Sequence, residues 1–167
     1  LDANTTADNN TALGALALTT NTTGTFNTAV GGNALNANTT ADENTSVGYN
    51  TLTSNTTGQD NTACGAGALN ANTTASNNTA VGRHALLTNT TGTNNVAVGK
   101  DALDAASTVS NNTAIGYNAG TDTTGGQNTF LGSTTGVQIT SGTNNVHIGY
   151  DIGHAGNISN SIGIGRN

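Results

Sequence analysis

Apolar positions recur along this chain with a period of 17 residues. The marker of the period is the pentad Asn-Thr-Ala-Val-Gly at residues 27–31, which recurs in phase along the whole chain in ten copies. The first seven copies start 17 residues apart, and the remaining steps are 16, 17 and 16 residues. A repeat this short and strict is typical of a solenoid, in which each repeat forms one coil that stacks on the last.

The pentad alternates in the way a short strand does. We number its positions as slots one to five: slot two is Thr in most copies, slot four is aliphatic or Cys, and slot three is mostly small. This alternation predicts a strand whose slots two and four face the interior of the coil. Cys64 is interpreted as a small buried hydrophobe in that column. The expected core column at slot four contains Val30, Val47, Cys64, Val81 and Val98.

A glycine ends the pentad in every copy, and a second apolar column follows four residues later. Glycine accepts a positive φ, so a tight turn out of the strand is expected there. Seventeen residues allow two strands of about five residues and two turns per coil. The sequence thus predicts an all-β fold, a parallel β-solenoid of stacked 17-residue coils. The second column forms its opposite wall and contains Leu35, Leu52, Leu69, Leu86 and Leu103.

Slot three is predicted to face outward, because it alternates with slots two and four. It is kept small and mostly apolar, whereas a strand position that faces solvent would collect Thr, Lys or Glu. We therefore expect identical chains to associate through slot three, most simply around a three-fold axis. This expected assembly face contains Ala12, Ala29, Ser46, Ala63, Ala80, Ala97 and Ala114.

The repeat is regular over residues 1–116 and loosens over residues 117–167. In the second part the leucine position becomes glycine, and slot three enlarges to Phe130 and His147. Terminal repeats of solenoids are commonly atypical. We interpret residues 1–116 as a regular shaft and residues 117–167 as an irregular continuation of the same solenoid.

Asn-Thr-Thr triplets precede the pentads with the same period. Asn and Thr favour turns, and stacked identical Asn side chains can form ladders between coils. The triplets also match the Asn-x-Ser/Thr pattern of glycosylation acceptors, and equal spacing would place them in one exposed row. Turn formation is the simpler interpretation. Glycosylation is the alternative at Asn21, Asn38, Asn55, Asn72 and Asn89.

Charge and composition argue against catalysis, nucleic-acid binding and a membrane span. Only 7% of the residues are charged, and 9 acidic residues against 3 Lys and Arg give a net charge of −6. Binding to phosphates needs clustered Lys and Arg, which this sequence lacks. No apolar run approaches the roughly 20 residues of a membrane-spanning helix. We predict a chain that is not an enzyme and needs no cofactor.

Histidines are the remaining candidates for metal binding. His84, His147 and His154 come without the spacing of a ligand set. His147 occupies slot three, so three copies could meet on a three-fold axis and hold an ion there. A role in packing or hydrogen bonding is the simpler interpretation. We therefore predict no metal site, with His147 as the position to examine.

The pentad and the residues after it resemble two related groups of repeats. The pattern Asn-Thr-Ala-Val-Gly-x-x-Ala-Leu-x-x-Asn-Thr-Thr-Gly is similar to the head repeats of trimeric autotransporter adhesins of the YadA type. Their core motif, Ser-Val-Ala-Ile-Gly, is approached most closely at residues 145–149 and 161–165. The pattern also resembles the repeat shaft of phage-tail-fibre-like surface proteins. The resemblance implies a left-handed β-roll assembled as a homotrimeric fibre that works in attachment.

These observations favour one function and leave one alternative. The favoured function is a non-enzymatic, extracellular fibre or adhesin segment at a cell or virion surface. Its main partner would be itself, as a homotrimer or filament, and a host surface glycan or protein is a further candidate partner. The alternative is a solenoid that binds ice or glycans through a face of its own.

Overall fold

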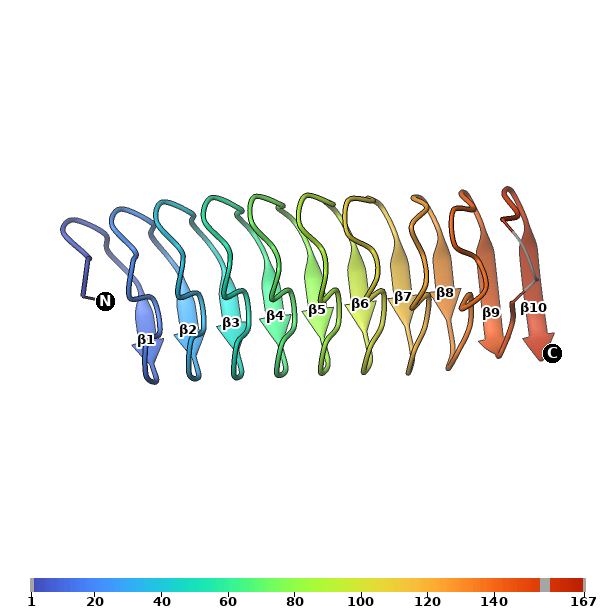
Figure 1. The fold of residues 1–167 in the computed structure, drawn as a ribbon, viewed down its shortest axis with the longest axis horizontal. Coiled ribbons are helices and arrows are strands. Elements are labelled where there is room, and N and C mark those ends of the chain that lie inside the picture. Colours follow the sequence, from blue (N-terminus) through green and yellow to red (C-terminus); the bar gives the residue numbers. More distant parts are fainter. Residues whose placement is uncertain (1, 154–156, 167) are drawn as a thin grey trace.

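The chain forms one row of stacked coils, so the first and the last coil lie at opposite ends of the molecule (Figure 1). The computed structural model describes residues 2–153 and 157–166. Ten strands lie side by side in one parallel sheet in chain order, which confirms the predicted all-β parallel solenoid. The strands are β1 Thr11–Leu13, β2 Thr28–Val30, β3 Thr45–Val47, β4 Thr62–Cys64, β5 Thr79–Val81, β6 Val96–Val98, β7 Thr113–Ile115, β8 Thr129–Leu131, β9 Val146–Tyr150 and β10 Ile162–Arg166.

The pentads pair in register, so each slot stacks on the same slot of the next coil. Ala29 lies opposite Ser46, for example, and Val30 opposite Val47. Hydrogen bonds extend this ladder beyond both ends of the strands. The Thr28 N–H donates to the Asn44 carbonyl at 2.8 Å. In parallel sheets neighbouring strands lie about 4.8 Å apart, so the ten strands span roughly 45 Å.

Each coil contains one strand of three to five residues, so the prediction of two strands per coil is wrong. The rest of the coil is a series of turns, because several positions have a left-handed backbone. In the second coil these include Asn33 at φ 58° and Leu35 at φ 50°. Hydrogen bonds still join the turns of neighbouring coils: the Leu35 N–H donates to the Thr51 carbonyl at 3.1 Å. The ladder therefore surrounds the coil without a second strand.

The strand faces the opposite way from the prediction. Slot three points into the coil, and Ala29, Ala63 and Ala80 are completely buried there. Slot four points outward: Val47 and Val81 are each 37% exposed. Two predictions are therefore wrong. They are the core column at Val30, Val47, Cys64, Val81 and Val98 and the assembly face at Ala12, Ala29, Ser46, Ala63, Ala80, Ala97 and Ala114.

The leucine column explains this orientation. Leu35, Leu69 and Leu86 are fully buried, as predicted, and each reaches across the coil toward the strand. A 17-residue coil leaves room for one large side chain, so the strand opposite must contribute a small one. A left-handed backbone at leucine costs about 1–2 kcal/mol, and full burial of the side chain returns about 1.5–3 kcal/mol.

Size changes in the core occur in matched pairs. In the eighth coil slot three is Phe130, and the leucine position of that coil is Gly136. A Cβ at Gly136 would lie 2.4 Å from the Phe130 ring, and one at Gly120 would lie 2.7 Å from it. In the third coil Ser46 donates a 2.6 Å hydrogen bond to the Thr51 hydroxyl. Phe130 and the polar pair are thus accommodated inside the coil, and the solenoid continues through them.

Two ladders of buried asparagine join the coils, one over residues 21–89 and the other over residues 27–145. One is the triplet asparagine predicted from the sequence, and the other is slot one. Both ladders meet at a carbonyl: Gly58 accepts from the Asn55 amide and from the Asn44 amide, each at 2.9 Å. In the slot-one ladder the Asn61 N–H also donates to Asn44 Oδ1 at 3.1 Å. The ladder members are Asn21, Asn38, Asn55, Asn72 and Asn89 in one, and Asn27, Asn44, Asn61, Asn78, Asn95, Asn112, Asn128 and Asn145 in the other.

The matched pair at Phe130 and Gly136 makes a prediction about stability. Phe130→Ala leaves a cavity and should lower the free energy of unfolding by about 3–5 kcal/mol. Gly136→Leu drives a side chain into the Phe130 ring and should also destabilise the chain. The double variant restores the alanine–leucine pair of the regular coils, so it should be more stable than the sum of the two losses predicts. Urea unfolding of the four chains measures this coupling, and strictly additive losses would contradict it.

Candidate interaction surfaces

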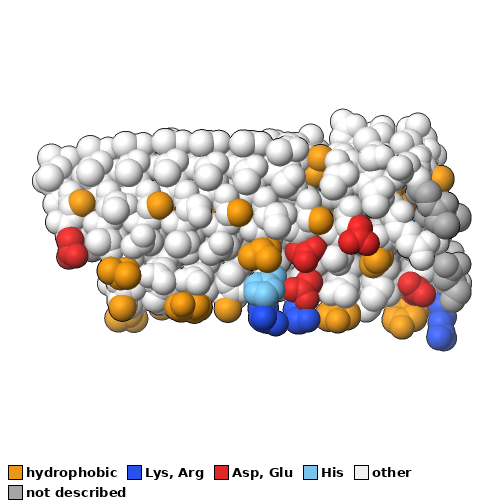
Figure 2. All heavy atoms as spheres, in the orientation of Figure 1, with side chains coloured by type: hydrophobic (Ala, Val, Ile, Leu, Met, Phe, Trp, Pro, Cys, Tyr) orange, Lys and Arg blue, Asp and Glu red, His pale blue; other side chains and the backbone are white. Residues whose placement is uncertain are grey.

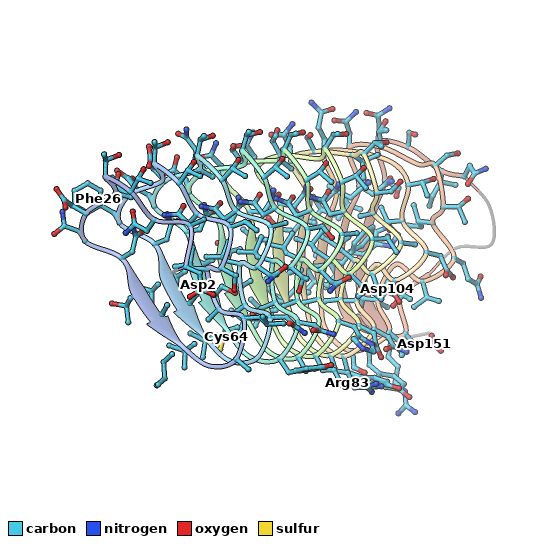
Figure 3. The ribbon with its side chains drawn as sticks, turned by 60° about the vertical axis from the view of Figure 1, so that its left-hand side comes forward. Asp2, Phe26, Cys64, Arg83, Asp104 and Asp151 are labelled. Carbon is cyan, nitrogen blue, oxygen red and sulfur yellow. The ribbon has the colours of Figure 1, made fainter. Side chains whose placement is uncertain are left out.

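The outward side of the strands is the first surface with the character of a contact site. We call it the strand face and define it as slots two and four of β1 to β10. Cys64 lies on it and is exposed (Figure 3). No charged residue occurs in either slot along the whole sequence. The slot-four column consists of Leu13, Val30, Val47, Cys64, Val81, Val98, Ile115, Leu131, Ile148 and Ile164.

A continuous aliphatic column of this length is unusual for a surface. Exposed apolar side chains are common singly, but contiguous apolar patches on soluble proteins mark sites of interaction. Slot two adds mainly threonine, with Val96, Val146 and Ile162 as the aliphatic exceptions. The sequence carried a signal for this orientation in the size difference between slots three and four. The smaller column fits inside a narrow coil, and the larger column is left outside.

The predicted glycosylation row is not exposed. The side chains of Asn21, Asn38 and Asn55 are fully buried, and their amide groups are engaged in the ladder. A glycan needs its asparagine amide at the surface. The expectation of an exposed row at Asn21, Asn38, Asn55, Asn72 and Asn89 is therefore wrong. The equal spacing correctly predicts that these residues stack in one row. It does not show whether their side chains point into the coil or toward solvent.

His147 is buried inside the coil and does not face a neighbouring chain. Its Nε2 atom lies 2.9 Å from the Ser161 hydroxyl, and its ring makes an edge contact with Phe130 at 6.1 Å between centroids. The packing and hydrogen-bonding interpretation therefore describes this residue. Across the described part of the chain, no three His, Cys, Asp or Glu side chains are grouped so that they could hold a metal ion. His154 lies outside the described residues.

A second surface follows the strand ends, at the position directly after the slot-five glycine. We call this position slot six. All three Lys and Arg residues of the chain, Arg83, Lys100 and Arg166, occupy it, and so do Tyr49, Tyr117 and Tyr150. Figure 2 shows hydrophobic and basic side chains gathered along this edge of the molecule, while the opposite edge is uncharged. This column was not predicted from the sequence, although its members recur with the spacing of the pentad.

Ion pairs and ring contacts hold part of the slot-six column in place. Lys100 Nζ lies 2.7 Å from one oxygen of Asp101 and 5.1 Å from the centre of the Tyr117 ring. His84 Nδ1 lies 3.3 Å from the other oxygen of Asp101. The hydrogen bond from Lys100 lowers the pKa of Asp101, and the same bond raises the pKa of Lys100. Asp101 is therefore a negative centre that both Lys100 and His84 contact.

Two other carboxyl groups, those of Asp104 and Glu43, have raised pKa values. Burial raises the pKa of Asp104, and the charges of Asp101 and Asp122 act in the same direction. A hydrogen bond with Asp60 raises the pKa of Glu43, and the charge of Asp60 adds to the effect. Perturbed pKa values also arise in structural networks of charged groups, so these two shifts do not by themselves mark a catalytic site.

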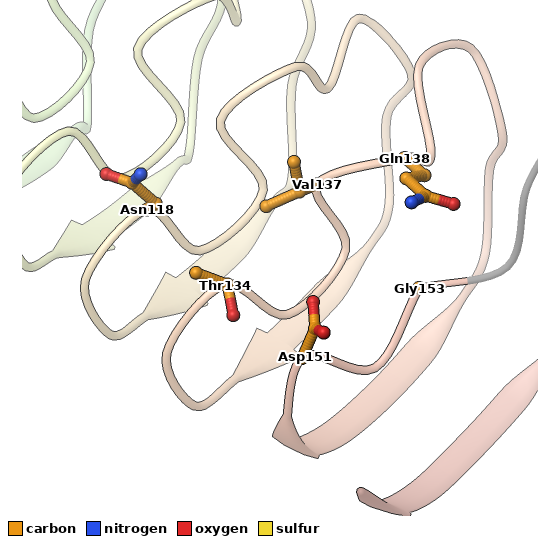
Figure 4. Close-up of a pocket in the computed structure, with 6 residues that line it drawn as sticks. All are labelled: Asn118, Thr134, Val137, Gln138, Asp151 and Gly153. Carbon is orange, nitrogen blue, oxygen red and sulfur yellow. The ribbon is translucent and has the colours of Figure 1, made fainter. Parts of the chain in front are cut away.

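Two notches interrupt the turn side of the solenoid. One has a volume of about 380 Å³ and lies between Tyr49 and Arg83. The other, of about 210 Å³, is lined by Asn118, Thr134, Val137, Gln138, Asp151 and Gly153 (Figure 4). Four of these residues have polar side chains, and the six come from three successive coils. Both notches sit within one chain and away from the strand face.

Comparison with known families, with curated proteins and with solved structures gives no match for this chain. The fold and its surfaces therefore carry the argument about function. Within residues 2–153 and 157–166 the structure has no helix that is long and apolar enough to cross a membrane.

The ion pair at Asp101 can be tested by titration. Lys100→Gln removes the main cause of the lowered pKa, so the pKa of Asp101 should rise toward its ordinary value near 4. In the wild-type chain the pair stabilises the fold above about pH 4, and this stabilisation is lost as the pH falls through the lowered pKa. Carbon-13 NMR of the Asp101 carboxyl measures the shift. Arg166→Gln is the control, and an equal change in both variants would contradict the assignment.

Proposed function

We propose that this chain is a segment of a non-enzymatic fibre at a cell or virion surface, where identical chains pack together through the strand face and serve attachment. The observation that supports it is the aliphatic column that follows the strand face through all ten coils. The resemblance to trimeric adhesin heads and phage-fibre shafts favours three chains around a common axis. The orientation of the strand changes the contact surface: it is slot four and slot two, with slot three inside each chain.

The thinness of a single coil supports association. Each of the first six coils buries one leucine and a few alanines, while ordering each residue of the backbone costs about 1–2 kcal/mol. Burial of a further Val, Leu or Ile side chain contributes about 1.5–3 kcal/mol. Packing the strand face against another chain adds one such side chain per coil. A long fibre segment would gain this contribution at every step of the stack.

The chemistry of the strand face favours a second copy of the chain as its partner. A neighbouring copy repeats its side chains at the same spacing of about 4.8 Å, so valine and threonine rows can interdigitate along the whole length. A globular partner has no such period. The lack of charge in slots two and four removes the like-charge repulsion that would separate identical acidic chains. Self-association is therefore the simplest way to cover this face.

Substitutions on the strand face test this association. Val47→Glu together with Val81→Glu places two carboxylates in the proposed contact, so the assembly should dissociate into single chains. Thr40→Glu together with Thr74→Glu adds the same charge at exposed turn positions and should leave the assembly intact. Light scattering after size exclusion gives the mass of each. A wild-type chain that is monomeric, or equal masses for the two variants, would contradict the proposal.

Ice binding is the second candidate, because the same strand face carries threonine in most of its strands. Slot two is Thr in seven of the strands described, and the outward side chain beside it is aliphatic in six of them and Cys64 in β4. The two functions require the strand face in opposite states, since ice binding needs it open and a fibre contact covers it. Thermal hysteresis of the wild-type solution separates them. The fibre proposal predicts none, and substantial hysteresis from a monomer would replace it.

A further inference from the structure

The larger notch exists because one coil lacks side chains where its neighbours have them. Ala66 and Gly67 occupy slot six and the position after it, between Tyr49-Asn50 and Arg83-His84 of the adjacent coils. No other coil has two such small residues at this pair of positions. Coils repeat at about 4.8 Å, so the residues on either side lie about 10 Å apart. The His84 ring fills part of this gap, since a Cβ at Gly67 would lie 2.8 Å from it, and the remaining notch is wide enough for one ring.

The wall on one side is an aromatic ring. Tyr49 is an exposed residue, and its ring rests over Gly32 of the preceding coil, where a Cβ would lie 3.3 Å from the ring. The ring fits there because Gly32 has no side chain. The other side of the ring lines the notch together with Ala66. An aromatic face placed in this way can stack on the apolar face of a sugar ring.

The wall on the other side is a cation. Lys100 is paired with Asp101, and Arg166 lies 5.4 Å from the centre of the Tyr150 ring. In contrast, Arg83 makes neither an ion pair nor a ring contact within the described residues. Its guanidinium group is free to bind a carboxylate with two parallel hydrogen bonds.

Amide groups complete the lining. Asn50 Oδ1 accepts a 2.8 Å hydrogen bond from Asn33, and Asn70 Nδ2 donates at 3.0 Å to the Asn50 carbonyl. These bonds fix both side chains and use one end of each. The Asn50 NH2 group and the Asn70 amide oxygen are left to face a ligand. One donor and one acceptor of this kind suit the hydroxyl groups of a sugar.

We infer that this notch binds a sugar ring that carries a carboxylate, as in an acidic polysaccharide. The ring stacks on Tyr49, the carboxylate pairs with Arg83, and hydroxyl groups bond to Asn50 and Asn70. Every one of these residues lies outside slots two and four. The site is therefore complete in one chain, and it does not depend on association through the strand face.

The test uses tri-galacturonate as the acidic probe and the uncharged galactose trimer as its matched neutral sugar. Proton–nitrogen NMR of the wild-type chain should show shifts at Asn50, Gly67 and His84 with the acidic probe and much smaller shifts with the neutral one. Arg83→Gln should weaken binding of the acidic probe about tenfold or more, because a charge-assisted pair is lost. Ala66→Leu fills the notch without changing the charge, so this variant should also bind the acidic probe more weakly.

Arg166→Gln is the control for these variants, since it removes the same charge from slot six outside the notch. It should bind the acidic probe as the wild-type chain does. Circular dichroism of each variant shows that the coil is intact. An equal loss of affinity for the acidic probe in Arg83→Gln and Arg166→Gln would show that only the overall charge attracts the probe. This result would overturn the proposed site. Equal binding of the two probes, or no shift with either, would overturn it too.

Discussion

Between Gly24 and Gly92, each coil is tied to the next at a buried carbonyl that accepts hydrogen bonds from two asparagine ladders, and beyond it the slot-one asparagine alone makes this bond. At Gly58, for example, the donors are Asn55 of the same coil and Asn44 of the coil before it. A buried amide without partners costs about 1–3 kcal/mol, so the ladders hold only if every coil repeats the same backbone. This requirement explains the strict period, the asparagine at slot one in every copy before Ser161, and the repeated left-handed positions.

The narrow interior follows from the same repeat. A coil short enough to stack with all these bonds satisfied encloses one leucine and a small residue opposite it. Larger aliphatic side chains must then lie outside, which produces the strand face. Where the interior does change, as at Phe130, a glycine on the facing wall makes room. Packing therefore sets the orientation of the strand, and the exposed aliphatic column that supports the fibre proposal is a consequence of it.

The sequence predicted the period, the parallel stack, the leucine column and the asparagine ladder of the triplets. It did not predict which side of the strand is buried. Alternation shows that slots two and four share a side, and the choice of side depends on volume within the coil. Both Val81 and Ala80 fit an alternating pattern, and the space beside Leu86 decides between them. The notch was missed for a related reason: Ala66 and Gly67 matter only when Tyr49 and Arg83 are seen as their neighbours.

The central claim is that slot three is inside the coil and slot four outside. The native Cys64 at slot four and a cysteine moved to slot three by Ala63→Cys with Cys64→Val allow a direct test. Both chains would carry Val47→Glu and Val81→Glu to keep the strand face open. Reaction with a thiol reagent should then be fast at Cys64, and at position 63 it should proceed only as fast as the whole coil unfolds. Equal rates, or faster reaction at position 63, would contradict the account.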